Sequence, residues 1–327
     1  MDPTAHRRRS RRTASALTTA AALAVVLTTA LLHRAPAPAE AAYPAAPAAP
    51  ATPTPAAPEQ CTDPEASLRP DGLDGAAIAR IKQAGKLVAG VDQSSFRWGY
   101  RNPANNQLEG FDIALVKAIA KDILGNENAV IYRAVPTSQR IPALQEGRVD
   151  LVVRTMTINC ARLADVAFST AYFEAGQQVL APVNSTITGF DDSLRGRRVC
   201  AASGSIAEAA LTREPHGSHL VTVPNQLDCL VRLQLGEVDG VVTDNALAAG
   251  QAAQDPKVRL VGKPFTREFY GVAMPKNATD LVRRVNKVLE NYRAGGDNSE
   301  WMKAYVQYLR DDLPGITAPP APKYRDG

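Results

Sequence analysis

The sequence contains one internal repeat, which constrains the fold more than any other feature. Residues 144–153 (LQEGRVDLVV) and residues 233–242 (LQLGEVDGVV) match without a gap at Leu, Gln, Gly, Val, Asp, Val and Val. Each copy is typical of a helix end, a glycine that stops the helix, a tight turn and a buried strand. The repeat predicts two related helix–strand units; the alternative is chance similarity between two ordinary turns of this kind.

Polar residues follow both repeated strands directly. Arg154, Thr155 and Thr157 come after the first copy, and Thr243 and Asp244 come after the second. In open α/β sheets, ligands bind beyond the carboxyl ends of the strands. We therefore expect two such units, in separate lobes, to direct these side chains into one cleft.

Strand-like and helix-like runs alternate along the rest of the chain. This order predicts an α/β fold with parallel sheets covered by helices. Pro142 fits the helix that contains it only in the first turn, because proline lacks the backbone N–H that later turns require. The predicted helices span residues 76–84, 113–124, 138–146 and 227–235, and the predicted strands span residues 86–91, 129–134 and 149–153.

The N-terminus has the order of an export signal. Five Arg between residues 7 and 12 precede an uncharged run at 13–32, and a small-x-small pattern follows at 39–41. We expect residues 1–41 to be an export signal or, alternatively, an uncleaved membrane anchor, because a run of about 20 residues can span a bilayer. The Pro/Ala-rich residues 42–60 are predicted to be an extended linker. The protein is thus expected outside the cytoplasm, on the cell-surface or cell-wall side.

Composition excludes several classes of protein. The chain is 45% hydrophobic and 21% charged, which is incompatible with a wholly disordered chain or a polytopic membrane protein. Its net charge of +4 comes from the first 41 residues, which hold six Arg and two acidic residues; the remaining 31 basic and 31 acidic residues balance. A neutral body argues against a nucleic-acid partner.

Four cysteines, Cys61, Cys160, Cys200 and Cys229, are present, and export makes disulfides feasible. None of them forms a metal-type C-x-x-C pair, and four cysteines allow three pairings. Cys200 and Cys229 lie in the same later segment, so we favour Cys200–Cys229 together with Cys61–Cys160. The second pair would fasten the start of the folded part to the domain. Four buried free thiols are the alternative.

A set of motifs resembles the extracytoplasmic solute-binding proteins of polar amino-acid ABC transporters (family 3). The similarity covers nearly everything from Cys61 to the C-terminus and is greatest to the glutamate/glutamine-binding branch of actinobacteria. The cysteine contexts also resemble that branch. The motifs are GVD at 90–92, LEGFDI at 108–113, TMTINCAR at 155–162, FSTAYF at 168–173, LRGRRV at 194–199, GS at 204–205 and VTD at 242–244.

This resemblance implies a two-lobed, periplasmic-binding-protein-like fold of type II. Two strands would cross between the lobes, near residues 181–182 and 270–272, and the lobes would close on a ligand by a hinge motion. The implied boundaries are residues 61–182 plus 274–316 for lobe 1, 183–273 for lobe 2 and 317–327 for a C-terminal tail.

The resemblance also implies contacts to the α-amino and α-carboxyl groups of an amino acid. Arg162 occupies the family's carboxylate-binding position, which suits a planar guanidinium; the alternative is a surface Arg. Thr157 and Thr155 would add hydroxyl and backbone N–H donors, and Ser205 a backbone N–H from lobe 2. Asp244 matches the family's ammonium acceptor; its alternative role is a helix N-cap.

Four further residues are expected around the ligand side chain: Arg140, Arg154, Phe96 and Arg97. Arg140 matches a position that reads a distal carboxylate or amide, and its alternative is a solvated helix Arg. Arg154 would favour an acidic ligand or pair with another charge of the protein. Two or three Arg near the side chain favour glutamate or aspartate, with glutamine next.

The implied function is the substrate-binding component of an ABC importer, a monomer that works with a membrane permease and needs no cofactor or metal. One alternative is an amino-acid sensor that signals to a membrane protein. A remote alternative is an enzyme on the same fold, because fold alone does not fix function. Catalysis would need a positioned acid or base, yet outside the N-terminal region the only histidines are His216 and His219, in a Gly/Pro-containing loop. We therefore expect no enzymatic activity.

Overall fold

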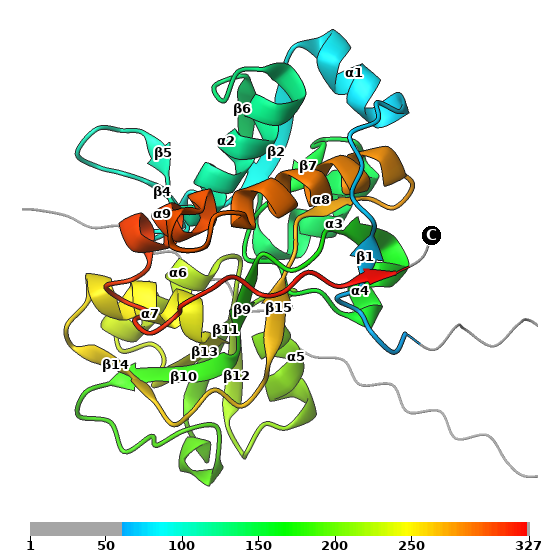
Figure 1. Cartoon of the computed structure of the whole chain (residues 1–327). Helices are drawn as coiled ribbons and strands as arrows, with labels where there is room; N and C mark the ends of the chain where they lie inside the picture. Colours follow the sequence, from blue (N-terminus) through cyan, green and yellow to red (C-terminus); the bar gives the residue numbers. More distant parts are fainter. Residues whose placement is uncertain (1–60, 326–327) are drawn as a thin grey trace, which may run out of the picture. The chain divides into compact units, whose positions relative to one another are not determined.

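The structure, a computed structural model, describes residues 61–325. The expected export signal at 1–41 and linker at 42–60 lie outside the described residues. Two five-stranded sheets organise the described part of the chain (Figure 1). Among these residues, no helix is both long and apolar enough to cross a membrane.

The first sheet has the strand order β6-β2-β7-β16-β8. Its first three strands are parallel, and β16 runs antiparallel to both of its neighbours. We call this sheet and its helices the first lobe. The strands are β2 (Leu87–Val91), β6 (Val130–Ala134), β7 (Leu151–Val152), β8 (Val166–Phe168) and β16 (Ala273–Pro275), and the helices are α1 (Ala76–Ala84), α2 (Phe111–Leu124), α3 (Arg140–Gln145), α4 (Cys160–Asp165), α8 (Thr279–Arg293) and α9 (Glu300–Tyr308).

The second sheet repeats this arrangement with the order β12-β11-β13-β10-β14, in which β10 is the antiparallel strand. We call it and its helices the second lobe. The strands are β10 (Gln177–Pro182), β11 (Arg198–Ala202), β12 (His219–Val223), β13 (Gly240–Asp244) and β14 (Val258–Val261), and the helices are α5 (Ile206–Arg213), α6 (Gln226–Gln234) and α7 (Asn245–Gln254).

The two copies of the sequence repeat occupy equivalent places in the two sheets. Each repeated strand, β7 or β13, lies third in its sheet, beside the antiparallel strand. The shared aspartate has the same role in both copies: Asp150 accepts a hydrogen bond from the N–H of Val88 at 2.8 Å, and Asp239 accepts one from the N–H of Arg198 at 2.8 Å. Each aspartate thus fixes the start of the neighbouring parallel strand, which explains why it recurs.

Two strands link the lobes. β9 (Phe173–Ala175) pairs antiparallel with β15 (Glu268–Tyr270). The second crossing therefore overlaps the expected position near 270–272. The first crossing comes earlier than expected, because Gln177–Pro182 is a strand held between β13 and β14. The expected boundary at residue 182 thus moves to about residue 176.

Short elements complete the fold. The C-terminal tail passes the crossing region and ends in β17 (Tyr324–Arg325), which pairs in parallel with β1 (Ser67–Leu68) (Figure 1). Pro142 is the third residue of α3 and lies in its first turn, as the sequence requires. The remaining elements are β3 (Ser94–Ser95), β4 (Gly99–Arg101), β5 (Leu108–Glu109) and the 3₁₀ turns η1 (Thr137–Gln139), η2 (Asp192–Leu194) and η3 (Gly296–Asn298).

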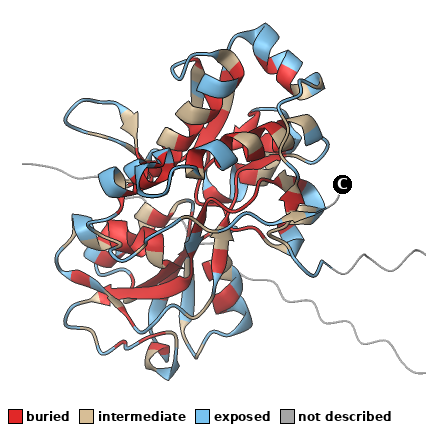
Figure 2. Cartoon of the chain, viewed as in Figure 1, coloured by how far each residue is buried: buried red, intermediate tan, exposed pale blue. Residues whose placement is uncertain are grey.

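Buried residues occur throughout both lobes and along the crossing strands (Figure 2). An aromatic cluster lies at this junction: Trp98 meets Phe173 edge-on with ring centroids 4.8 Å apart, and Tyr270 lies 5.7 Å from Trp98. The indole N–H of Trp98 donates to the carbonyl of Ala246, in α7 of the second lobe, at 3.2 Å. The two lobes are therefore in direct contact.

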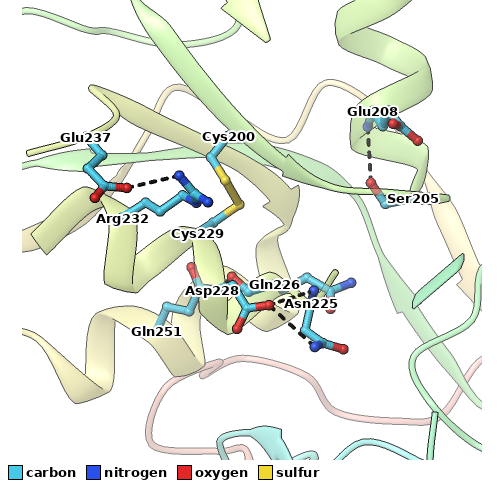
Figure 3. Close-up of a disulfide and its surroundings, with 10 residues drawn as sticks. All are labelled: Cys200, Ser205, Glu208, Asn225, Gln226, Asp228, Cys229, Arg232, Glu237 and Gln251. Atoms are coloured by element: carbon cyan, nitrogen blue, oxygen red, sulfur yellow. Dashed lines mark hydrogen bonds and ion pairs between the residues drawn. A yellow bond between two sulfur atoms is a disulfide. The ribbon is translucent and has the colours of Figure 1, made fainter. Parts of the chain in front are cut away.

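Both expected disulfides are present. Cys61–Cys160 joins the start of the described chain to the first residue of α4. Cys200–Cys229 joins β11 to α6 inside the second lobe (Figure 3). The described residues hold no free cysteine, so the alternative of four free thiols is wrong.

Candidate ligand-binding site

Three buried arginines converge between the lobes. Arg140 begins α3, Arg154 follows β7, and Arg162 is the third residue of α4; their exposed fractions are 3%, 0% and 8%. Arg140 and Arg162 each donate an Nη2–H to the carbonyl oxygen of Gly204 in the second lobe, at 3.3 and 3.2 Å. Arg140 and Arg162 thus gather positive charge at one point between the lobes, which favours an anion there.

Local structure fixes Arg162. The Asn159 side chain caps α4 by accepting from the backbone N–H of Arg162 at 2.9 Å, and Nη1 of Arg162 donates to the carbonyl of Thr157 at 2.7 Å. Burial lowers the pKa of Arg162, while the carboxyl groups of Asp244 and Glu268 oppose this shift. The side chain is buried between the lobes, so the alternative of a surface Arg is wrong.

Arg140, like Arg162, is held in place by a hydrogen bond to a nearby backbone carbonyl. Its Nε donates to the carbonyl of Thr137 at 2.9 Å. Burial, followed by repulsion from Arg162 and Arg154, lowers the pKa of Arg140 well below its usual value. The alternative of a solvated helix Arg is therefore wrong.

The charge of Arg154 is balanced inside the protein. Its Nη2 lies 2.9 Å from the carboxylate of Asp92 and also donates to Oδ1 of Asn225, in the second lobe, at 3.0 Å. Burial raises the pKa of Asp92, but the charge of Arg154 and hydrogen bonds from Ser95 and Ser94 outweigh burial and lower it overall. The second alternative for Arg154, pairing with a charge of the protein, is thus what the structure shows.

The carboxyl side of the site is formed by Asp244 and Glu268. Asp244 ends β13, is 7% exposed and accepts from Nε2 of Gln177 at 2.8 Å. It occupies the N-cap position of α7, but its side chain makes no capping bond there. Burial, followed by repulsion from Glu268, raises the pKa of Asp244 well above its usual value. Glu268 accepts from the Thr157 hydroxyl at 2.7 Å.

Asp112 supports the loop that follows β7. It accepts from the N–H of Thr155 at 3.0 Å and from the hydroxyl of Tyr172 at 2.8 Å. Thr155 adopts a φ of 41°, which is uncommon for a residue other than glycine. Its backbone N–H is therefore already used within the protein, and its contribution is to the shape of the loop. Burial is the main cause that raises the pKa of Asp112 to about 7.

Two expected contacts differ in the structure. Arg97 turns towards the C-terminal segment, where its Nε lies 3.2 Å from Asp312, because a positive φ of 64° reverses the chain there. The N–H of Ser205 donates to the carbonyl of Ala202, and its hydroxyl caps α5 by accepting from the N–H of Glu208 at 3.1 Å (Figure 3). A helix N-terminus needs such a cap, so both groups of Ser205 are engaged locally.

Phe96 lies at the edge of the site region. Its ring is 5.1 Å from that of Tyr100, and the guanidinium of Arg97 lies over it at 5.2 Å. Its backbone carbonyl approaches Gly250 of α7, where a Cβ would come within 3.0 Å. Phe96 is thus part of the contact between the lobes.

Further residues join the site that the sequence did not single out as ligand contacts: Glu268, Asp92, Asp112, Gln177 and Thr137. Asp92 and Asp112 lie inside motifs that carry the family resemblance, and nothing else in the sequence indicated that they belong to the site. Glu268 and Gln177 had none, because each reaches the site through strand pairing with residues far away in sequence. Among the described residues, no group of three or more His, Cys, Asp or Glu side chains is arranged to hold a metal ion.

The fold and the site define a two-lobed protein in which buried side chains of both charges gather where the lobes meet. Residues 87–308 match the family model of bacterial extracellular solute-binding proteins, family 3, and the chain belongs to this family. The resemblance seen in the motifs is thus confirmed. Members of this family act outside the cytoplasm.

Several amino-acid-binding proteins are similar to this chain in sequence or in structure. The glutamine-binding protein GlnH of an ABC transporter from Bacillus subtilis (strain 168) is 36% identical over 230 residues, covering 70% of this chain and 84% of that protein. The glutamate-binding protein GluB from Corynebacterium efficiens is 29% identical over 273 residues, covering 78% and 89%. The crystal structure of the solute receptor for L-cysteine of Neisseria gonorrhoeae matches with a TM-score of 0.68 at 26% identity, covering 72% and 94%.

Proposed function

We propose that this protein is the substrate-binding component of an ABC importer and captures a polar L-amino acid between its lobes. The observation that carries the proposal is the placement of Arg162 and Asp244, buried and on opposite lobes. A guanidinium can bind the α-carboxylate bidentately, and a carboxylate can accept from the α-ammonium. One amino acid can then bridge both lobes and favour the state in which they touch.

The ligand side chain is proposed to face Arg140 and the Asp92–Arg154 pair. Because Asp92 balances Arg154, the number of free cations available to a second carboxylate is smaller than the sequence suggested. A second carboxylate would need a free cation to balance its buried charge, whereas a neutral carboxamide needs only hydrogen bonds. We therefore place glutamine ahead of glutamate. The named relatives include binders of both.

The partner in this proposal is a membrane permease, to which the loaded protein delivers its amino acid as a monomer. The Cys61–Cys160 disulfide suits an oxidising compartment outside the cytoplasm. We keep the export signal, cleaved or retained as an anchor, as part of the proposal. We assign no reaction to the site.

Isothermal titration tests the proposal. The purified protein is stripped of amino acids by partial unfolding and refolding, then titrated with glutamine, glutamate, aspartate, asparagine, arginine and histidine. We expect Kd values of about 1 μM or tighter for glutamine, and a loss of at least about 100-fold in Arg162→Ala, since a buried charge-assisted pair is worth several kcal/mol. Arg148→Ala, an exposed arginine paired with Glu146, is the matched control.

A second variant addresses the side-chain pocket. Arg140→Ala is expected to weaken the binding of all ligands and to weaken glutamate more than glutamine, because it removes the cation that a second carboxylate needs. Folded, stripped protein that binds none of the six amino acids would rule out this assignment.

A further inference from the structure

The start of α6 forms a contact between the lobes that uses neither of the residues proposed to hold the α-groups of the ligand. The backbone N–H of Thr137 donates to the carbonyl of Pro224 at 3.3 Å, and its hydroxyl donates to Oε1 of Gln226 at 3.3 Å. Nη2 of Arg154 donates to Oδ1 of Asn225 at 3.0 Å. Three consecutive residues of the second lobe thus bond to two residues of the first lobe.

Each side of this contact is held in place from within its own lobe. Thr137, Arg154 and Gln226 are buried. Nη1 of Arg154 donates to the Thr137 hydroxyl at 2.9 Å, which leaves the hydrogen of that hydroxyl for Gln226. In the second lobe, Asp228 accepts from the backbone N–H of Asn225 at 3.0 Å and from its Nδ2 at 3.4 Å, which leaves Oδ1 for Arg154 (Figure 3).

The same contact reaches the proposed ligand site through the first lobe. Nε of Arg140 donates to the carbonyl of Thr137 at 2.9 Å. Both Nη atoms of Arg154 are engaged within the protein, by Thr137, Asp92 and Asn225. When the lobes meet, the contact therefore fastens residues that surround the site.

We propose that Thr137, Arg154, Asn225 and Gln226 form a latch, which we call the α6 latch, that holds the lobes closed and raises the affinity for every ligand by the same factor. The inference rests on the proposed function, in which a ligand binds between lobes that open and close. In the open state water replaces the partners across the cleft, so these bonds favour the closed state alone. Asn225 and Gln226 make no contact with the ligand and are positioning residues that act through closure.

The α6 latch has a kinetic consequence. A ligand enters the open protein, in which the latch is not formed, so the association rate constant does not depend on it. After closure the latch slows reopening and lowers the dissociation rate constant. Loss of the latch should therefore raise Kd through the dissociation rate constant. A residue that touched the ligand side chain would instead change Kd by different factors for glutamine and for glutamate.

The experiment is calorimetric titration and stopped-flow binding of L-glutamine and L-glutamate to the stripped proteins Asn225→Ala and Gln226→Ala. Tryptophan fluorescence reports closure, because the indole N–H of Trp98 bonds to Ala246 across the lobes. We expect Kd to rise about tenfold or more in Asn225→Ala, which loses a bond to a charged group, and about three- to tenfold in Gln226→Ala. Both ligands should be affected by the same factor.

Two further sets of variants separate the latch from a general effect on folding. Gln234→Ala is the matched control for Gln226→Ala, because Gln234 lies in the same helix and bonds to Asp255 at 3.0 Å inside the second lobe. Urea denaturation of the stripped proteins should give equal free energies of unfolding for these two variants, while only Gln226→Ala weakens binding. In the first lobe, Thr137→Val should weaken binding at least as much as Gln226→Ala, and Thr137→Ser, which keeps the hydroxyl, should restore it.

Each outcome decides a different point. Equal rises of Kd for both ligands, carried by the dissociation rate constant, support the latch. Wild-type Kd values in Asn225→Ala and Gln226→Ala overturn the latch and leave the proposed function standing. Unequal factors for glutamine and glutamate also overturn it, since these residues then contact the ligand. Absence of binding in the wild-type protein overturns the proposed function and the latch with it. Should the variants of the second lobe fail to fold, the comparison of Thr137→Val with Thr137→Ser decides.

Discussion

At the scale of single residues, Asp112 shows how a buried side chain outside the ligand contacts fixes the loop that carries them. Its carboxylate holds the loop that carries Thr155 and accepts from Tyr172, yet it lies in a fully buried place. Its pKa in the folded protein is about 7, above the ordinary value of 3.8. A raised pKa means that the folded state favours the protonated form. The stabilisation from this group is therefore complete below about pH 4 and is lost as the pH rises through 7.

We predict that Asp112→Asn changes the pH dependence of stability. In the wild-type protein this group alone should lower the free energy of unfolding by about 4 kcal/mol between pH 4 and pH 8. The variant should lack that component, which urea denaturation at a series of pH values would measure. Asp122→Asn, on the same helix and paired with Arg284 at 3.2 Å, should keep the wild-type slope. Parallel profiles for wild type and Asp112→Asn would contradict this account.

At the scale of elements, the two disulfides act on different parts of the molecule. Cys200–Cys229 closes a separation of 29 residues within the second lobe. Cys61–Cys160 closes a separation of 99 residues and holds the first residue of α4, two positions before Arg162. The first is thus expected to act on stability, and the second on stability and on the site.

We predict that the double variants Cys200→Ser/Cys229→Ser and Cys61→Ser/Cys160→Ser both lower the free energy of unfolding, by about 3 to 5 kcal/mol on the loop-entropy account. Only the second should also weaken ligand binding, because α4 loses its anchor beside Arg162. Thermal unfolding and titration with glutamine would measure the two effects, and each variant serves as control for the other. Equal affinities in the two variants would show that the anchor of α4 is irrelevant to the site.

At the scale of the whole molecule, the contact between lobes depends on a glycine. Gly204 of the second lobe has a φ of 75°, and a Cβ there would lie 2.9 Å from the Cα of Ser138 in the first lobe. Its carbonyl receives the bonds from Arg140 and Arg162. Close approach of the backbone at this point is therefore needed for the lobes to meet.

We predict that Gly204→Ala weakens ligand binding by about tenfold or more, equivalent to about 1.4 kcal/mol, because the methyl group keeps the lobes apart. Gly196→Ala is the control: its φ is 70° and nothing lies within 4 Å of the added methyl, so it carries the backbone strain alone. Titration gives the affinities, and small-angle scattering with saturating glutamine gives the compaction. Identical affinities for the two variants would show that the close contact between Gly204 and Ser138 is not needed for the lobes to close on the ligand.

The sequence by itself predicted the α/β class, helices at 76–84, 113–124, 138–146 and 227–235, strands at 86–91, 129–134 and 149–153, and two equivalent repeat units. These features depend on local periodicity, helix stops and short-range pattern, which are present in any stretch of about ten residues. The sequence also favoured, among three possible pairings, the two disulfides that the structure contains. The motifs also pointed to Arg162, Arg140 and Asp244, which the structure brings to one place. Arg97 and Ser205 were expected there as well, but a positive φ and a helix cap direct their groups elsewhere.

Tertiary structure alone decided the charge partners. Asp92 and Arg154 pair across neighbouring strands, and Thr157 reaches Glu268 over a separation of 111 residues. The position of the first crossing likewise depends on tertiary structure, because Gln177–Pro182 pairs with β13 and β14 and so belongs to the second sheet. Sheet pairing and lobe contact bring together residues that no local pattern connects, and burial then makes each charge depend on its neighbours. For this reason the sequence identified the cations of the site, while only the fold showed which of them are already balanced.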